Sequence, residues 1–193
     1  ACLRPKADIH TGIYGRDRSC YNVPGEVMEH RYLKTALALA VGLLAALWFA
    51  NNLLNWDIAH AAVAYTLSQQ DQGGYAIHLV PPIDSPLLAT VVLIAIVAGE
   101  GVAGALALTG VYRMWKVRKL DDRTFASAKR YASLGAGAAV LVWFLLFQVL
   151  GGTLILMGQS EGLVATLEGA FRFAVYSFLT LIYLSLPETN PSD

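Results

Sequence analysis

The sequence predicts an all-α fold: a four-helix transmembrane bundle with a polar, largely irregular N-terminal extension. Hydrophobic residues make up 56% of the 193 residues and charged residues only 15%, and the mean hydropathy is +0.51. The charges gather near the start of the chain and in one stretch between two apolar runs. Because a soluble domain of this size would spread charged side chains over its whole surface, we expect one compact membrane domain.

Four apolar runs are long enough to cross the hydrocarbon core, which takes a helix of about 20 residues. They cover about residues 35–54, 87–112, 131–157 and 163–186. None shows the alternation of a barrel strand, and backbone polar groups in hydrocarbon must be satisfied within a helix. Pro86 and Pro187 stand where the second helix should begin and the fourth should end. We therefore expect a membrane domain over residues 35–188 and a short C-terminal tail, 189–193.

The N-terminal extension, residues 1–34, is polar and mixed in charge, with no helical or strand period. It does not resemble a signal peptide, because the apolar run starts too late and continues as a full span. Its acidic residues also make it a poor transit peptide. Since Ala1 is not a methionine, we expect that a segment was removed before it. A tail of this composition does not order by itself, so we expect other polypeptides to hold it.

The two cysteines, Cys2 and Cys20, are interleaved with His10 and His30. Their spacing fits no standard zinc pattern, which leaves coincidence, a metal clip or a disulfide as interpretations. All histidines lie outside the apolar runs, which excludes a bis-histidine haem between helices of this chain. No nucleotide-binding or hydrolase motif occurs. We expect no metal site, no enzymatic activity, and no cofactor other than bound lipid.

The orientation follows from the stretch between the second and third runs. Its basic residues are Arg113, Lys116, Arg118, Lys119, Arg123, Lys129 and Arg130. The same stretch contains only two acidic residues, Asp121 and Asp122. The segment between the first and second runs has neither Lys nor Arg. The positive-inside rule predicts that both termini and this basic loop lie on the cytoplasmic or matrix side of a bacterial or mitochondrial inner membrane. The loop sets the topology and is also able to bind anionic lipid headgroups.

The second run contains one charged residue, Glu100, near its middle. A carboxylate at that depth is costly unless it is protonated, paired or facing a polar cavity. Gly104 and Ala107 follow it at helical spacing, and such small residues let another helix approach, so we expect Glu100 to point into the bundle. Arg172 in the fourth run is the expected partner, together with Gln148 in the third. The alternatives are a proton or ion relay through Glu100 and the binding of a lipid or quinone headgroup.

A polar cluster lies around the end of the first run and comprises Asn52, Asn55, Asp57 and His60. Asp57 and His60 are a possible metal or acid–base pair, but two residues do not make a site. We expect instead that Asp57 caps the N-terminus of a helix. Residues 59–67 are apolar enough for that helix to lie on the membrane surface.

Several motifs carry a resemblance to a known family. They are Gly99-Glu-Gly-Val-Ala-Gly-Ala-Leu, Val111-Tyr-Arg-Met-Trp-Lys-Val-Arg, Phe125-Ala-Ser-Ala-Lys, Leu141-Val-Trp-Phe, Val149-Leu-Gly-Gly, Met157-Gly-Gln-Ser, Ala170-Phe-Arg-Phe and Leu184-Ser-Leu-Pro-Glu. In this order, from about Ala36 to Glu188, the chain resembles the bacterial predicted small integral membrane proteins of domain-of-unknown-function family 2165. The resemblance implies four transmembrane helices and no particular activity. The chain departs from the family pattern by lacking its tryptophans in residues 152–158 and by having Pro81-Pro82.

Two functions are consistent with these features. The first is a non-catalytic structural or accessory subunit of a larger inner-membrane energy-transducing, respiratory-type complex. Its partners would be membrane lipids and other membrane subunits, and not nucleic acid. The second is a small proton- or ion-coupled transporter that uses the intramembrane carboxylate. A water-filled path to Glu100 would favour the transporter, and a dry bundle with an extensive partner surface would favour the subunit.

Overall fold

The computed structural model describes residues 25–71, 74 and 77–188, and the elements within them are all helical. Their order is α1 (Gly25–Leu54), α2 (Trp56–Ser68), α3 (Pro86–Val117), α4 (Asp122–Val140), the π-helical segment η1 (Leu141–Leu154), the short 3₁₀ turn η2 (Met157–Gln159) and α5 (Glu161–Ser185). The predicted all-α class is confirmed. The expectations for the rest of the N-terminal extension, including those for Cys2, Cys20 and His10, lie outside the described residues.

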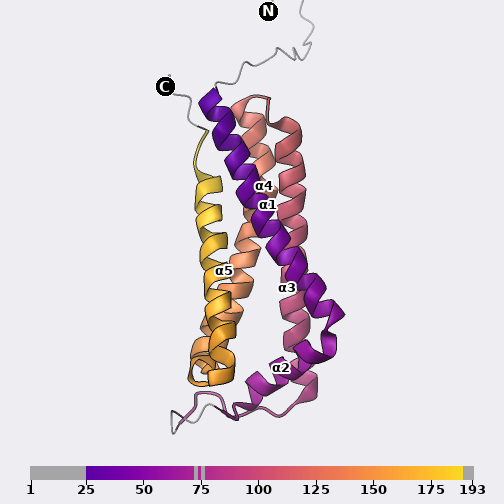
Figure 1. Cartoon of the computed structure of the whole chain (residues 1–193), viewed down its shortest axis with the longest axis vertical. Helices are drawn as coiled ribbons and strands as arrows, with labels where there is room; N and C mark the ends of the chain where they lie inside the picture. The colour runs from indigo at the N-terminus through magenta and orange to yellow at the C-terminus, as the bar shows by residue number, and fades with distance from the viewer. Residues whose placement is uncertain (1–24, 72–73, 75–76, 189–193) are drawn as a thin grey trace, which may run out of the picture.

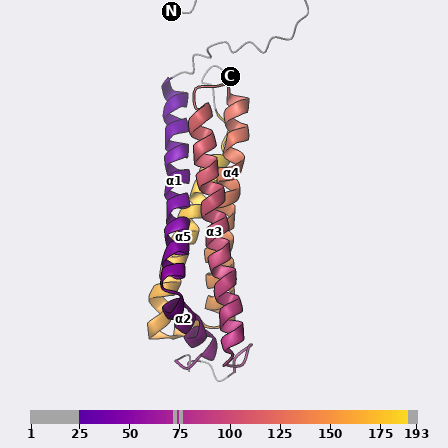
Figure 2. The ribbon, with the colours of Figure 1, turned by 90° about the vertical axis from the view of Figure 1, so that its right-hand side faces the viewer.

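Four helices are long and apolar enough to cross a membrane: α1, α3, α4 continued by η1, and α5. They lie roughly along one axis, and the shorter α2 lies across one end of the bundle (Figures 1 and 2). We call the opposite end, formed by the start of α1, the α3–α4 turn and the end of α5, the basic end. The end next to α2 is the far end. This arrangement confirms the four predicted spans.

The boundaries differ from the prediction at the basic end. Helix α1 begins at Gly25, so the polar residues up to Lys34 continue the helix of the first span. They do so because Arg31 and Lys34 are buried against neighbouring elements, where they have polar partners. The predicted basic loop is likewise two helix ends joined by a short turn, since α3 continues to Val117 and α4 already begins at Asp122.

Local capping explains two of the helix starts. At α3, the Ser85 side chain accepts a hydrogen bond from the Leu88 backbone N–H, and Pro86 occupies the first helical position. At α4, Asp121 accepts one from the backbone N–H of Thr124. The third span therefore begins earlier in the chain than predicted, because this cap lets charged residues form the first turns of α4.

Small residues bring the backbones of α1, α3 and α4 close together. A Cβ atom placed on Gly104 of α3 would lie 3.0 Å from the backbone nitrogen of Ala46 in α1. A Cβ on Gly135 of α4 would collide with the backbone of Ala107 in α3. In hydrocarbon, where apolar surface gives little drive for association, such close contact is a main source of helix–helix attraction.

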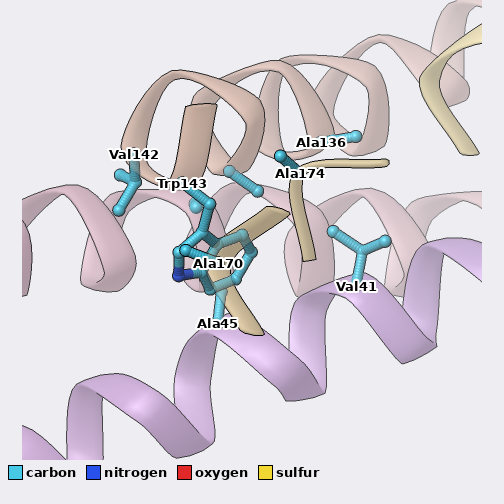
Figure 3. Close-up of a cluster of buried hydrophobic side chains, with 9 residues drawn as sticks. Val41, Ala45, Ala136, Val142, Trp143, Ala170 and Ala174 are labelled. Carbon is cyan, nitrogen blue, oxygen red and sulfur yellow. The ribbon is translucent and has the colours of Figure 1, made fainter. Parts of the chain in front are cut away.

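The bundle centre combines alanines with one aromatic cluster. Figure 3 shows these buried side chains, which are Val41, Ala45, Ala103, Ala136, Ala139, Val142, Trp143, Ala170 and Ala174. The ring of Trp143 meets Phe173 edge-on at 5.4 Å between centroids, and Trp48 packs on Phe173 at 5.9 Å. Large rings therefore fill the space between α1 and α5, where the helices do not approach as closely as α1 and α3 do.

Candidate functional site

Glu100 lies inside the bundle, as the small residues around it predicted. It is 2% exposed, and its Oε2 accepts a hydrogen bond of 2.8 Å from the side-chain amide of Asn52 in α1. One turn further along α3, Gly104 packs against the backbone of α1. The carboxyl group is thus held between α1 and α3. The hydrogen bond from the neutral Asn52 amide reduces the free-energy cost of placing it in hydrocarbon.

The predicted Glu100–Arg172–Gln148 cluster is wrong. Arg172 points outward from α5 and pairs with Glu168 at 3.2 Å, with both side chains more than 60% exposed. Gln148 donates to the backbone oxygen of Leu167 at 2.7 Å and so joins η1 to α5. The prediction matched the depths of the three residues. It could not predict which helices are neighbours: α5 packs mainly on α4, η1 and α1 rather than on α3, and Arg172 is exposed.

The predicted polar cluster after the first span is dispersed. Asn52 belongs to α1 and contacts Glu100, whereas Asn55 donates to the backbone oxygen of Asn51. His60 bonds to Thr90 at the start of α3, at 3.1 Å. Asp57 lies in the first turn of α2 and does not cap it, because the cap position belongs to Asn55. Among the described residues no group of three or more His, Cys, Asp or Glu side chains is placed to hold a metal ion.

The basic end contains a buried arginine, Arg31, within the stretch that the sequence predicted as the polar N-terminal extension. The Arg31 side chain is 0% exposed and donates to the backbone oxygens of Arg118 and Leu120 at 2.8 and 2.7 Å. It also donates to Asp122 at 2.5 Å, and its guanidinium group lies 4.7 Å from the Phe125 ring centroid. A planar cation with several donors suits this position, because the turn between α3 and α4 presents these two carbonyl groups outside any helix.

A second buried network surrounds Glu188, just after α5. Lys34 and Lys129 donate to the same carboxylate oxygen at 2.8 and 2.6 Å, and both also donate to the backbone oxygen of Leu186. Burial raises the pKa of Glu188, but the hydrogen bonds from Lys129 and Lys34 outweigh it and hold that pKa below its ordinary value. The network ties α1, α4 and the segment after α5 together, and we call it the Glu188 clasp.

The clasp changes the interpretation of one residue. Lys129 was grouped with the exposed basic residues of the loop, yet it is 6% exposed and has a structural partner. A signal was present in the sequence: Phe125, Ala128, Lys129 and Ala132 recur at helical spacing, and all four are buried. Recognising it required knowing that α4 begins as early as Asp122.

Four other basic residues of the predicted loop line two hollows at the basic end: Arg113, Lys116, Arg123 and Arg130. One, of about 470 Å³, lies between α3 and α4 and is lined by Arg113, Lys116, Val117, Arg123, Thr124, Ser127 and Ala128. We call it the α3–α4 groove. The other, of about 510 Å³, lies between α4 and the end of α5, beside the Glu188 clasp. Glu100 lines neither hollow.

Comparison with known proteins gives one match. The model of a family described as "Predicted small integral membrane protein (DUF2165)" matches residues 30–187. No curated protein and no solved structure matches the chain. The matched region includes Glu100, Arg31, Lys34 and Lys129, and it ends one residue before Glu188.

Proposed function

The chain belongs to the DUF2165 family of predicted small integral membrane proteins, and we propose that it is a non-catalytic, multi-pass subunit of a larger membrane complex. The observation that carries the proposal is the surroundings of Glu100. This carboxyl group is 2% exposed, has a neutral amide as its hydrogen-bond partner, and lines neither hollow. A catalytic or transport centre needs access for its substrate, whereas a packing residue does not.

The exposed side chains of α5 support the proposal that the chain contacts another protein. It is the least buried of the four spanning helices, and it exposes Phe171, Tyr176, Phe178 and Leu179 by more than half. Aromatic side chains are enriched at protein interfaces because they bury a large rigid surface. We therefore place the contact with a neighbouring subunit on α5. In its narrowest form, the proposal assigns the chain to an energy-transducing, respiratory-type complex of an inner membrane, on the sequence features described above.

Purification of the full chain from its native membrane in a mild detergent tests the proposal. We expect it to migrate with other membrane subunits on a native gel, and mass spectrometry of that band identifies the complex. The paired substitution Phe171→Ala and Tyr176→Ala should release the chain from the complex. Val91→Ala with Ile94→Ala, which removes exposed apolar groups from α3 instead, should not. A chain that migrates alone would contradict the proposal, and a different kind of complex would contradict only its narrowest form.

A second candidate function, a proton- or ion-coupled transporter, is favoured by the position of Glu100 within a spanning helix. Reconstitution into sealed vesicles tests it. Under this alternative, Glu100→Gln abolishes flux driven by a pH gradient, and Glu168→Gln, which changes an exposed carboxyl group on α5, leaves it intact. The subunit proposal expects no flux from the wild-type chain.

We also propose that the basic end faces the cytoplasm or matrix, with both termini on that side, because the exposed Lys and Arg side chains gather there. Single cysteines at the exposed positions Lys119 and Gln70, in a chain lacking Cys2 and Cys20, test the orientation. A membrane-impermeant thiol reagent added from outside should label the cysteine at position 70 and spare the one at 119. The opposite pattern would invert the topology.

A further inference from the structure

We propose that the α3–α4 groove binds the phosphate group of an anionic phospholipid. Three basic side chains line it, Arg113, Lys116 and Arg123, and all three are exposed. Its lining includes no carboxylate. Among the ion pairs of the described residues, none involves these three cations. The groove is therefore a concave surface with uncompensated positive charge.

The acidic residues of the neighbouring turn form no ion pair with these cations, because the side chain of each is held by another partner. Asp122 binds the buried Arg31 at 2.5 Å. Asp121 accepts hydrogen bonds from the backbone N–H and the hydroxyl of Thr124, at 2.9 and 2.7 Å. The same contacts that build the turn thus leave the cations of the groove without a counter-ion.

Aromatic rings position two of the cations. The guanidinium carbon of Arg113 lies 4.0 Å from the ring centroid of Tyr131, and the ammonium group of Lys116 lies 4.4 Å from that of Tyr112. Such contacts restrict a long side chain while leaving its charge available to an anion. Ser127, which is exposed in the groove, offers a hydroxyl donor to a phosphate oxygen.

The surroundings indicate a lipid rather than a soluble phosphate. Tyr112 and Trp115 are 59% and 51% exposed at this level, and such side chains settle at the boundary between headgroups and acyl chains. Towards the bundle centre, the face of α4 that carries Ser127 and Tyr131 continues to the exposed Leu134 at helical spacing. A phosphate held in the groove would have its acyl chains along this apolar face.

The hollow beside the Glu188 clasp is the weaker candidate for the same ligand. It also contains basic residues, but Asp122 and Glu188 are part of its lining, and Lys129 is already bound to Glu188. An anion placed there would meet two carboxylates. The difference between the two hollows makes the proposal specific to the α3–α4 groove.

Native mass spectrometry of the full chain in a mild detergent, titrated with phosphatidylglycerol, tests the proposal. The triple variant Arg113→Gln, Lys116→Gln and Arg123→Gln should bind this lipid at least about tenfold more weakly, given what each basic side chain contributes near an anionic surface. The matched control removes three exposed cations outside the groove, with Lys119→Gln, Arg130→Gln and Arg172→Gln, and should keep wild-type affinity. Equal weakening in both variants would overturn the groove as the site.

Two further arms use the wild-type chain, so the result does not depend on whether a variant folds. Phosphatidylcholine should bind more weakly than phosphatidylglycerol, and the preference should shrink as salt is raised. No preference between the two lipids would overturn the proposal. Glycerol phosphate without acyl chains should not displace the bound lipid at equal concentration. If it did, the groove would be a site for soluble phosphate and not for a membrane lipid.

Discussion

The basic end and the centre of the bundle stabilise the same four helices in opposite ways. At the basic end, buried cations reach carboxylates and backbone oxygens that belong to other elements, as Arg31, Lys34 and Lys129 do. At the centre, the carboxyl group of Glu100 has one amide partner, and the helices are held together mainly by close contact between small residues. Charge is thus placed where water and headgroups are near, and packing is used where hydrocarbon makes charge costly.

The largest effect should come from Arg31. Replacing it by Ala removes three hydrogen bonds from a charged group and leaves two carbonyl groups of the α3–α4 turn without these partners, so we expect a loss of about 3 kcal/mol in the free energy of unfolding. Denaturation of the purified chain in detergent measures it. Arg130→Ala removes an exposed arginine from the same end and should cost less than about 0.5 kcal/mol. Similar losses in both variants would mean that the buried network is not what stabilises the basic end.

The Glu188 clasp makes a prediction about pH. Because the pKa of Glu188 is held below its ordinary value of 4.5, its contribution to stability is present at neutral pH and disappears as the pH falls through the folded-state value. We expect the Tm to decline below about pH 4.5. Glu188→Gln should be less stable than wild type at pH 7 and should lack the part of this decline that Glu188 causes. Glu161→Gln, at an exposed position, should follow the wild-type profile, and a wild-type profile in Glu188→Gln would show that the clasp does not titrate.

A smaller effect is expected at the centre of the bundle. Glu100→Ala leaves the half-buried amide of Asn52 without its acceptor, which should cost about 1–2 kcal/mol. Glu100→Gln keeps an oxygen of the same reach and should cost less. Stability of the two variants, measured side by side in detergent, checks the order. If the glutamine variant were the less stable one, the carboxyl group would have a role that the hydrogen bond to Asn52 does not explain.

The smallest effect belongs to Arg172. Its pair with Glu168 is exposed and lies on one helix, so Arg172→Ala should change the free energy of unfolding by less than about 0.5 kcal/mol. The double variant with Glu100→Ala should be additive, because the two residues do not touch. A coupling energy above about 1 kcal/mol would indicate that the two residues interact directly, contrary to the structure.

The sequence predicted the four spans because each is a long apolar run that hydrocarbon forces to be helical. It did not predict the partner of Glu100, because hydropathy fixes the depth of a residue and not which helices are neighbours: α3 packs on α1, which carries Asn52, and not on α5. It also placed Lys129 among exposed cations, because the start of α4 depends on the cap at Asp121. The partners of Lys34 and Lys129 lie after α5, and so far along the chain that no local pattern connects them.

The Glu188 clasp also has a consequence for how the protein is made. The chain is synthesised from its N-terminus, so Lys34 and Lys129 enter the membrane domain before the residue that neutralises them exists. A product that stopped after Ser185 would contain every spanning helix, and yet two buried ammonium groups would lack their carboxylate. The buried charges of the basic end are therefore balanced only once the segment that follows α5 has been made, so the four spanning helices alone do not complete the fold.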